Sequence, residues 1–102
     1  MSIRVLTWMR LTDGRPQLWA VTGEGKLVST WQMKGTEANP KWVGWVPFPN
    51  PPGTIRTLMG VPLLDGRPQL FALTTEQGVF TVRKANTNPD AAWTGWEKFD
   101  VP

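Results

Sequence analysis

The sequence predicts an all-β fold made of two four-stranded antiparallel units, and three observations predict it. A stretch of about 50 residues occurs twice. Each copy contains short apolar runs separated by glycine-containing turns, and no segment has the 3.6-residue apolar period of a helix. Hydrophobic residues make up 40% of the chain and charged residues 19%, which is typical of a folded chain and not of a disordered one.

The repeat is clearest in the segment Asp-Gly-Arg-Pro-Gln-Leu, which occupies residues 13–18 and again residues 65–70. Around it, residues 3–22 and 55–74 are identical at 12 of 20 positions. The motif Trp-x-Gly-Trp then recurs at residues 42–45 and 93–96. A fixed period of this length is the signature of propellers and solenoids. We therefore expect a single domain, residues 1–102, that consists of two tandem repeats at about 3–50 and 55–102.

Each repeat is expected to contain four strands in order along the chain. In the first repeat these are residues 3–11, 17–22, 26–33 and a fourth strand that carries Trp-x-Gly-Trp and ends at Phe48. In the second repeat they are 55–64, 69–74, 79–84 and a fourth strand that ends at Phe99. Asp-Gly between the first two strands predicts a hairpin turn, because glycine accepts a positive φ. The second strand is apolar at successive positions, which suits burial on both of its faces.

Four strands per unit, covered by neighbours on both faces, is the geometry of a β-propeller blade. Two blades do not close a ring, since known propellers use roughly 4–8 blades. We therefore expect a cyclic homo-oligomer, with three chains and six blades favoured, and with two or four chains as the other even solutions. A monomeric two-sheet sandwich is the alternative architecture.

The composition argues against several classes of function. The chain has neither cysteine nor histidine, which removes the commonest metal ligands and the commonest general base. We expect no enzyme activity, no metal and no cofactor. The 11 basic residues are scattered, which argues against nucleic-acid binding, and no apolar run is long enough to insert into a membrane. The N-terminus lacks the apolar core of a signal peptide, so the compartment stays open, either cytoplasmic or reached by a non-standard route.

The segment from Asp13 to Gln32, followed by Trp42-Val-Gly-Trp-Val-Pro-Phe48, resembles the blade repeat of the PLL-type bacterial β-propeller lectins. It is similar, more distantly, to the tectonin-type lectins. The resemblance implies a lectin that binds monosaccharides or glycans, often fucose-like or methylated sugars, in pockets between adjacent blades. PLL-type rings are normally made from one long chain, so two blades look more like the small fucose lectins that trimerise. Those lectins bind fucose with an Arg-Glu-Trp trio, whereas Leu18 and Ser29 stand at the Arg and Glu positions here.

Sugar recognition needs an aromatic face for the C–H patch of the ring and a few fixed donors and acceptors for its hydroxyls. The predicted ligand-binding residues are Trp31, Gln32, Trp42, Trp45, Arg83, Trp93 and Trp96. The competing interpretation is packing: Trp31 between blades and one tryptophan of each pair inside its blade, because a three-residue spacing puts the two rings on opposite faces of a strand. Asp-Gly-Arg could contact hydroxyls or simply form a tight turn. The alternative function is a structural or protein-interaction propeller without sugar binding, which includes a designed or fragment propeller.

Overall fold

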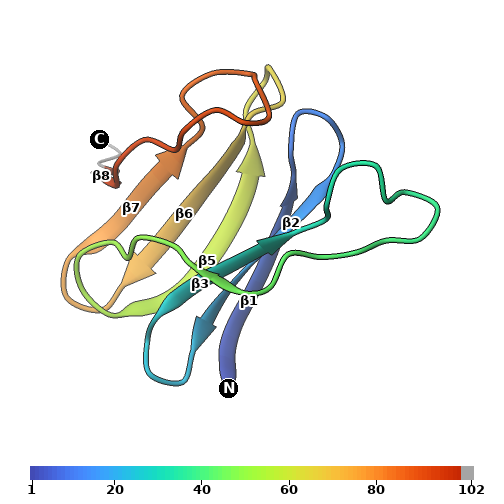
Figure 1. Ribbon diagram of the computed structural model, residues 1–102. Coiled ribbons are helices and arrows are strands. Elements are labelled where there is room, and N and C mark those ends of the chain that lie inside the picture. The colour runs from blue at the N-terminus through green and yellow to red at the C-terminus, as the bar shows by residue number, and fades with distance from the viewer. Residues whose placement is uncertain (100–102) are drawn as a thin grey trace.

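The computed structural model describes residues 1–99, and in this part of the chain all regular structure is β-strand (Figure 1). Sheet 1 consists of β1 (Ile3–Arg10), β2 (Pro16–Thr22), β3 (Leu27–Trp31) and β4 (Val46–Pro47). Sheet 2 consists of β5 (Ile55–Pro62), β6 (Pro68–Thr74), β7 (Gly78–Arg83) and β8 (Glu97–Lys98). Residues 100–102, the end of the second expected repeat, lie outside the described residues. The predicted all-β fold is confirmed, and no helix of residues 1–99 is long and apolar enough to cross a membrane.

Both sheets are antiparallel with their strands in chain order, β1-β2-β3-β4 and β5-β6-β7-β8. Their registers are the same: Trp8 is opposite Leu18 in sheet 1, and Gly60 is opposite Leu70 in sheet 2. Each first strand also has one register irregularity near its start. The strand residues of one repeat therefore have counterparts in the other, and the loop before Trp-x-Gly-Trp is one residue longer in the first repeat. The counterpart lies 52 positions away through β7 and 51 positions away from Trp-x-Gly-Trp onward.

The Asp-Gly-Arg segments form the predicted hairpin turns. Gly14 and Gly66 adopt φ values of 92° and 90°, which favour glycine. In the first turn Asp13 Oδ1 accepts a hydrogen bond from the Arg15 backbone N–H at 3.1 Å. Asp65 does the same for Arg67 in the second turn. The local chemistry of the motif thus fixes the turn, as expected of an aspartate that caps its own backbone.

The fourth strands are shorter than predicted. The Trp-x-Gly-Trp motifs precede β4 and β8 and are not part of them, and the backbone of each motif joins the ladder of its sheet through a single bridge. These bridges pair Gln32 with Trp42 and Lys84 with Trp93. A glycine in the middle of each motif weakens a strand, because it has no side chain to pack and a costly backbone to order. The argument that a strand would place the two rings of each motif on opposite faces therefore does not apply.

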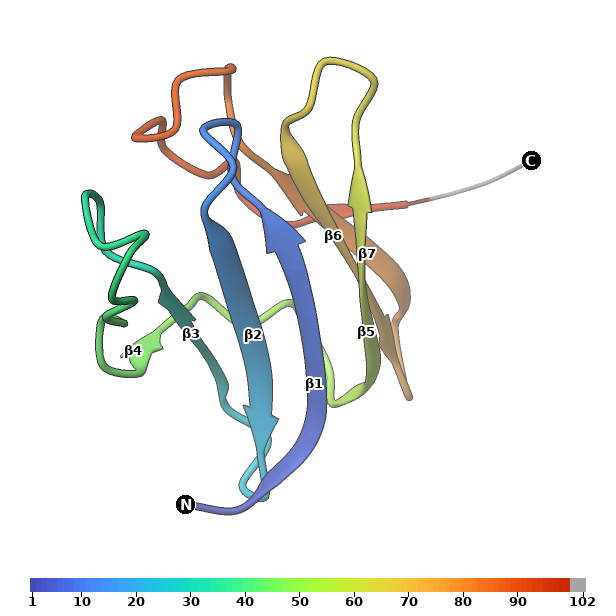
Figure 2. The same cartoon turned by 90° about the vertical axis from the view of Figure 1, so that its right-hand side faces the viewer.

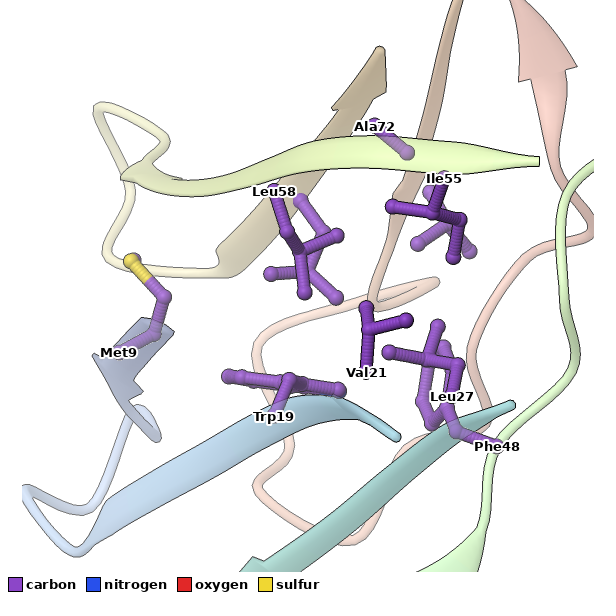
Figure 3. Packing of buried hydrophobic residues seen from close by; sticks show 10 residues of the cluster. Met9, Trp19, Val21, Leu27, Phe48, Ile55, Leu58 and Ala72 are labelled. Atoms are coloured by element: carbon purple, nitrogen blue, oxygen red, sulfur yellow. The ribbon is translucent and has the colours of Figure 1, made fainter. Parts of the chain in front are cut away.

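The two sheets pack with unlike faces together. Sheet 1 contributes Trp19 and Val21 to the core, and sheet 2 contributes Ala72 (Figure 3). Leu70 of sheet 2 belongs to the same core. Leu70 is the counterpart of Leu18, which neighbours Trp19 in β2 and therefore points to the opposite face of its sheet. The sheets are thus stacked front to back, with β1 and β5 side by side (Figures 1 and 2).

Trp19 is the centre of this interface, with none of its surface exposed. Its ring meets the rings of Phe48 and Trp93 edge to face, with centroids 6.1 and 5.5 Å apart. Such pairs add about 0.5–1.5 kcal/mol beyond the burial of their area. The indole N–H of Trp19 has no acceptor within the described residues, which costs about 1–3 kcal/mol of desolvation. The large ring therefore stabilises the interface by packing and not by its polar atom.

Candidate functional site between the two sheets

A cavity of ≈ 250 Å³ opens between the two sheets and combines aromatic rings with charged and amide groups. Its walls come from both repeats. Sheet 1 with its first hairpin turn supplies Leu11, Arg15, Gln17 and Trp31, and sheet 2 with its following loop supplies Lys84, Pro89, Asp90 and Trp93. The cavity therefore exists only because the two sheets are stacked front to back.

The sheet 1 wall is held by hydrogen bonds that start at the Asp-Gly-Arg turn. Arg15 Nε donates to Asp13 Oδ2 at 2.8 Å, and its Nη1 donates to the Gln32 carbonyl at 3.0 Å. Burial acts to raise the pKa of Asp13, but the hydrogen bonds from Arg15 outweigh it and hold the pKa below its ordinary value. Gln17 is buried, and its Nε2 donates to Ser29 Oγ at 2.9 Å. The guanidinium and the amide are thus fixed before any ligand arrives.

The sheet 2 wall is organised by Lys84. Its ammonium donates to the carbonyls of Pro89 and Ala91 at 3.1 and 2.7 Å and lies 5.2 Å from the centre of the Trp93 ring. Burial lowers the pKa of Lys84, because desolvation disfavours its charged form. These bonds hold the loop that presents Asp90 to the cavity. Asp90 also forms an exposed ion pair with Lys34, which contributes little to stability.

Two of the predicted ligand-binding residues, Trp31 and Trp93, line this cavity together. Trp96 packs against the core, and its Nε1 donates to the Pro49 carbonyl at 2.7 Å. Trp96 therefore packs inside the molecule, as the competing interpretation expected for one tryptophan of each pair. Trp93 packs against the core and also lines the cavity.

The remaining predicted residues lie on the outer faces of the sheets. Gln32 and Trp42 pair with each other on the face of sheet 1 that points away from sheet 2. Trp45 is exposed, and Arg83 lies on the outer face of sheet 2, 3.8 Å from Glu97. These four residues are not brought to the cavity.

Sequence reasoning missed Gln17, Lys84 and Asp90 as wall residues. Gln17 belongs to the identical six-residue segment, which is the one signal that could have pointed to it. Asp90 lies in a polar loop of the second repeat, and only the stacking of the sheets brings it opposite Trp31. No local sequence pattern predicts that these two distant residues line the same cavity.

A larger cavity of ≈ 570 Å³ lies between β1 and β5 and their hairpin turns. Its walls include Trp8, Met9 and Pro62 together with Gly14, Gly60 and Gly66. Three glycines and few polar side chains leave mainly apolar surface and backbone groups. The smaller cavity has more fixed donors and acceptors for its size, and this mixture is what small-ligand sites need for orientation. We therefore take the smaller cavity as the candidate site.

The charged and amide groups of this site belong to Arg15, Gln17, Lys84 and Asp90. Among residues 1–99, no three acidic side chains come together as a group of metal ligands. The chain matches no protein-family model, and no curated protein is significantly similar to it.

Proposed function

We propose that this chain is a carbohydrate-binding lectin whose sugar pocket lies between adjacent propeller blades, and that further copies of the chain complete the ring. Each four-stranded sheet is one blade in this proposal, and three chains give six blades. The observation that carries the proposal is the meeting of Trp31 and Trp93 with Arg15, Gln17 and Asp90 in one small cavity. Monosaccharides or the terminal sugars of glycans are the expected ligands.

The chemistry of the cavity supports a sugar. The half-buried indole of Trp31 offers an apolar surface for the C–H groups of a pyranose ring. Arg15 and Lys84 donate hydrogen bonds, Asp90 accepts them, and Gln17 does both. The volume of ≈ 250 Å³ lies below the ~300–1,000 Å³ typical of drug-sized ligands, so one sugar unit fits better than an oligosaccharide.

A ring of blades supports the function through multivalency. A single monosaccharide makes few contacts, so each pocket binds weakly. Several pockets on one ring raise the avidity for a glycosylated surface by about 10²–10⁴-fold when the spacing of the sugars permits. This advantage gives a physical reason for the chain to assemble.

Glycan-array screening of the purified chain tests the proposal. We expect binding to simple or methylated sugars, and a loss of about tenfold or more in Trp31→Ala, because the stacking surface is removed. Met33→Ala is the matched control, since Met33 is exposed two positions along the chain and does not line the cavity. Silence across a broad array, or equal binding by Trp31→Ala and the wild type, would overturn the proposal.

The second candidate function is a structural or protein-interaction assembly without sugar binding. The exposed apolar side chains on the outer faces of both sheets favour it, because such surfaces mark contacts with other protein. Under this alternative the chain assembles but shows no dependence on any sugar, so the same array distinguishes the two functions.

A further inference from the structure

Each sheet has one face covered by the other sheet and one open face. The open face of sheet 1 exposes Leu6, Trp8 and Trp42, and the open face of sheet 2 exposes Val61, Leu73 and Phe99. Trp8 is 54% exposed and Trp42 is 42% exposed. Exposed apolar side chains that share one face of a sheet are candidates for contact with a partner.

The two open faces are counterparts of the two faces that are already packed together. Leu70 and Ala72 of sheet 2 are buried against sheet 1, and their counterparts Leu18 and Ala20 lie on the open face of sheet 1. Trp19 of sheet 1 is buried against sheet 2, and its counterpart Phe71 lies on the open face of sheet 2. The open faces of the two sheets therefore carry the counterparts of the residues that form the two sides of the internal interface.

One contact of the internal interface, between Met9 and Gly60, has counterpart residues of very different size on the open faces. Inside the molecule, Met9 lies against Gly60, where an added Cβ would overlap the Met9 side chain and come within 2.9 Å of the Trp8 carbonyl oxygen. Their counterparts are Val61, which is smaller than methionine, and Trp8, which is far larger than glycine. Inside the molecule the longer side chain therefore belongs to sheet 1, whereas at the counterpart positions the larger side chain, Trp8, faces outward from sheet 1 and the smaller one, Val61, from sheet 2.

The aromatic groups follow the same correspondence. Inside the molecule, the Trp93 ring packs on Trp19 and Phe48. On the open face of sheet 2, Phe71 and Phe99 form the matching edge-to-face pair with ring centroids 5.0 Å apart, and no third ring is recorded against either of them among residues 1–99. The counterpart of Trp93 is Trp42, which is exposed on the other open face.

From these correspondences we infer that the open face of sheet 2 binds the open face of sheet 1 of a second copy of this chain, in the register of the internal interface. Trp42 of one copy then takes the place of Trp93 beside Phe71 and Phe99 of the next copy. The contact is heterologous, so repetition leads to a closed ring or a filament and not to a symmetric pair. This inference rests on the assembly part of the proposed function and is independent of sugar binding.

Complementation of two blocked variants tests the pairing of faces. Leu6→Arg places a charge on the open face of sheet 1, and Leu73→Arg places one on the open face of sheet 2, both at exposed positions that leave the internal core intact. In light scattering we expect an oligomer for the wild type and about 11.5 kDa for each variant alone. Their mixture should form a one-to-one dimer, because one unblocked contact remains. Equal melting temperatures would show that both variants fold.

The outcomes separate the inference from the proposed function. A monomeric wild type overturns assembly altogether. An oligomer that survives in either variant alone overturns this pairing of faces but leaves assembly standing. Sugar binding is read separately in the monomeric variants, because the cavity between the two sheets of one chain stays complete in them.

A second pair of variants tests the register. Val61→Met alone places a longer side chain against Trp8 and should weaken assembly by tenfold or more. Val61→Met together with Trp8→Gly recreates the internal Met-to-Gly contact and should restore it. Failure of the double variant to assemble better than Val61→Met would overturn the register.

Discussion

The two repeats share one backbone but differ in the side chains that line the cavity and its counterpart positions. Arg15, Gln17 and Trp93 keep their types as Arg67, Gln69 and Trp42. Three other wall positions change: Trp31 corresponds to Arg83, Lys84 to Gln32, and Asp90, through the shared Asn-Pro, to Lys41. Part of the cavity wall is thus the same in both repeats, while one indole, one cation and one carboxylate of the wall have other residue types at their counterpart positions.

Because of this difference, a pocket formed between two copies of the chain would have other rings and charges than the pocket inside one chain. The internal cavity has two indoles, two cations and one carboxylate. The counterpart set has one indole and three cations, Arg67, Arg83 and Lys41, without a carboxylate. Arg83 is paired with Glu97 at 3.8 Å, which offsets part of this charge. A pocket between copies would therefore be more positively charged than the internal one.

The largest expected loss of stability distinguishes a residue on the covered face of sheet 1 from its counterpart on the open face of sheet 2. Trp19→Ala should destabilise the chain by about 3–5 kcal/mol, because it empties the centre of the core. Phe71→Ala should cost less than half as much in the monomeric Leu6→Arg background, because the ring of Phe71 is only half-buried. Denaturant unfolding measures both, and equal losses would contradict the assignment of covered and open faces.

Trp19→Phe sharpens the same comparison, since phenylalanine is the residue of the second repeat at this position. It should cost under about 1.5 kcal/mol, because the smaller ring leaves a gap but also removes the indole N–H that lacks an acceptor. A loss as large as that of Trp19→Ala would show that the N–H is satisfied in the folded protein.

An intermediate effect is expected at Gly60, where the two repeats differ most in size. Gly60→Ala should destabilise the chain by about 1–3 kcal/mol, because the new Cβ meets Met9 and the carbonyl oxygen of Trp8. Gly95→Ala is the matched control, since a Cβ there meets nothing within 4 Å. Thermal unfolding should therefore separate the two variants, and an unchanged Gly60→Ala would mean that β1 and β5 are not in close contact.

The smallest expected effect is the pH dependence of stability that comes from the aspartates of the two Asp-Gly-Arg turns. The pKa of Asp13 lies below its ordinary value of 3.8, so the unfolded chain binds more protons and stability falls as the pH drops below about 4. Asp13→Asn should cost under about 1 kcal/mol at pH 7 and close to nothing near pH 2. Asp65→Asn should show the same sign with a smaller amplitude, because Asp65 is more exposed. Urea unfolding at several pH values measures this difference, and a cost that grows in acid would contradict it.

Much of the fold could be predicted from local patterns. The repeat, the first three strands of each unit and the Asp-Gly-Arg turns follow from residues that act on their own backbone, such as Gly14 at positive φ. The fourth strands were predicted too long, because Trp-x-Gly-Trp looks like strand sequence although its glycine interrupts the ladder. Two of the eight wall residues, Trp31 and Trp93, could be predicted as well, because tryptophan is a common sugar-stacking residue. Gln17 and Asp90 could not, because their meeting depends on how two distant segments pack.

The sequence by itself determined the duplicated four-stranded units, since turn residues and short apolar runs act over a few positions. It could not determine which face of each sheet is covered, because β2 and β6 carry apolar residues on both faces. The tertiary structure decided which face is covered through side-chain volume. Met9 packs against Gly60, and the Trp19 ring packs edge to face against the Trp93 ring. The same choice placed Trp31 in the cavity and left Trp42 exposed, although both are tryptophans near strand ends.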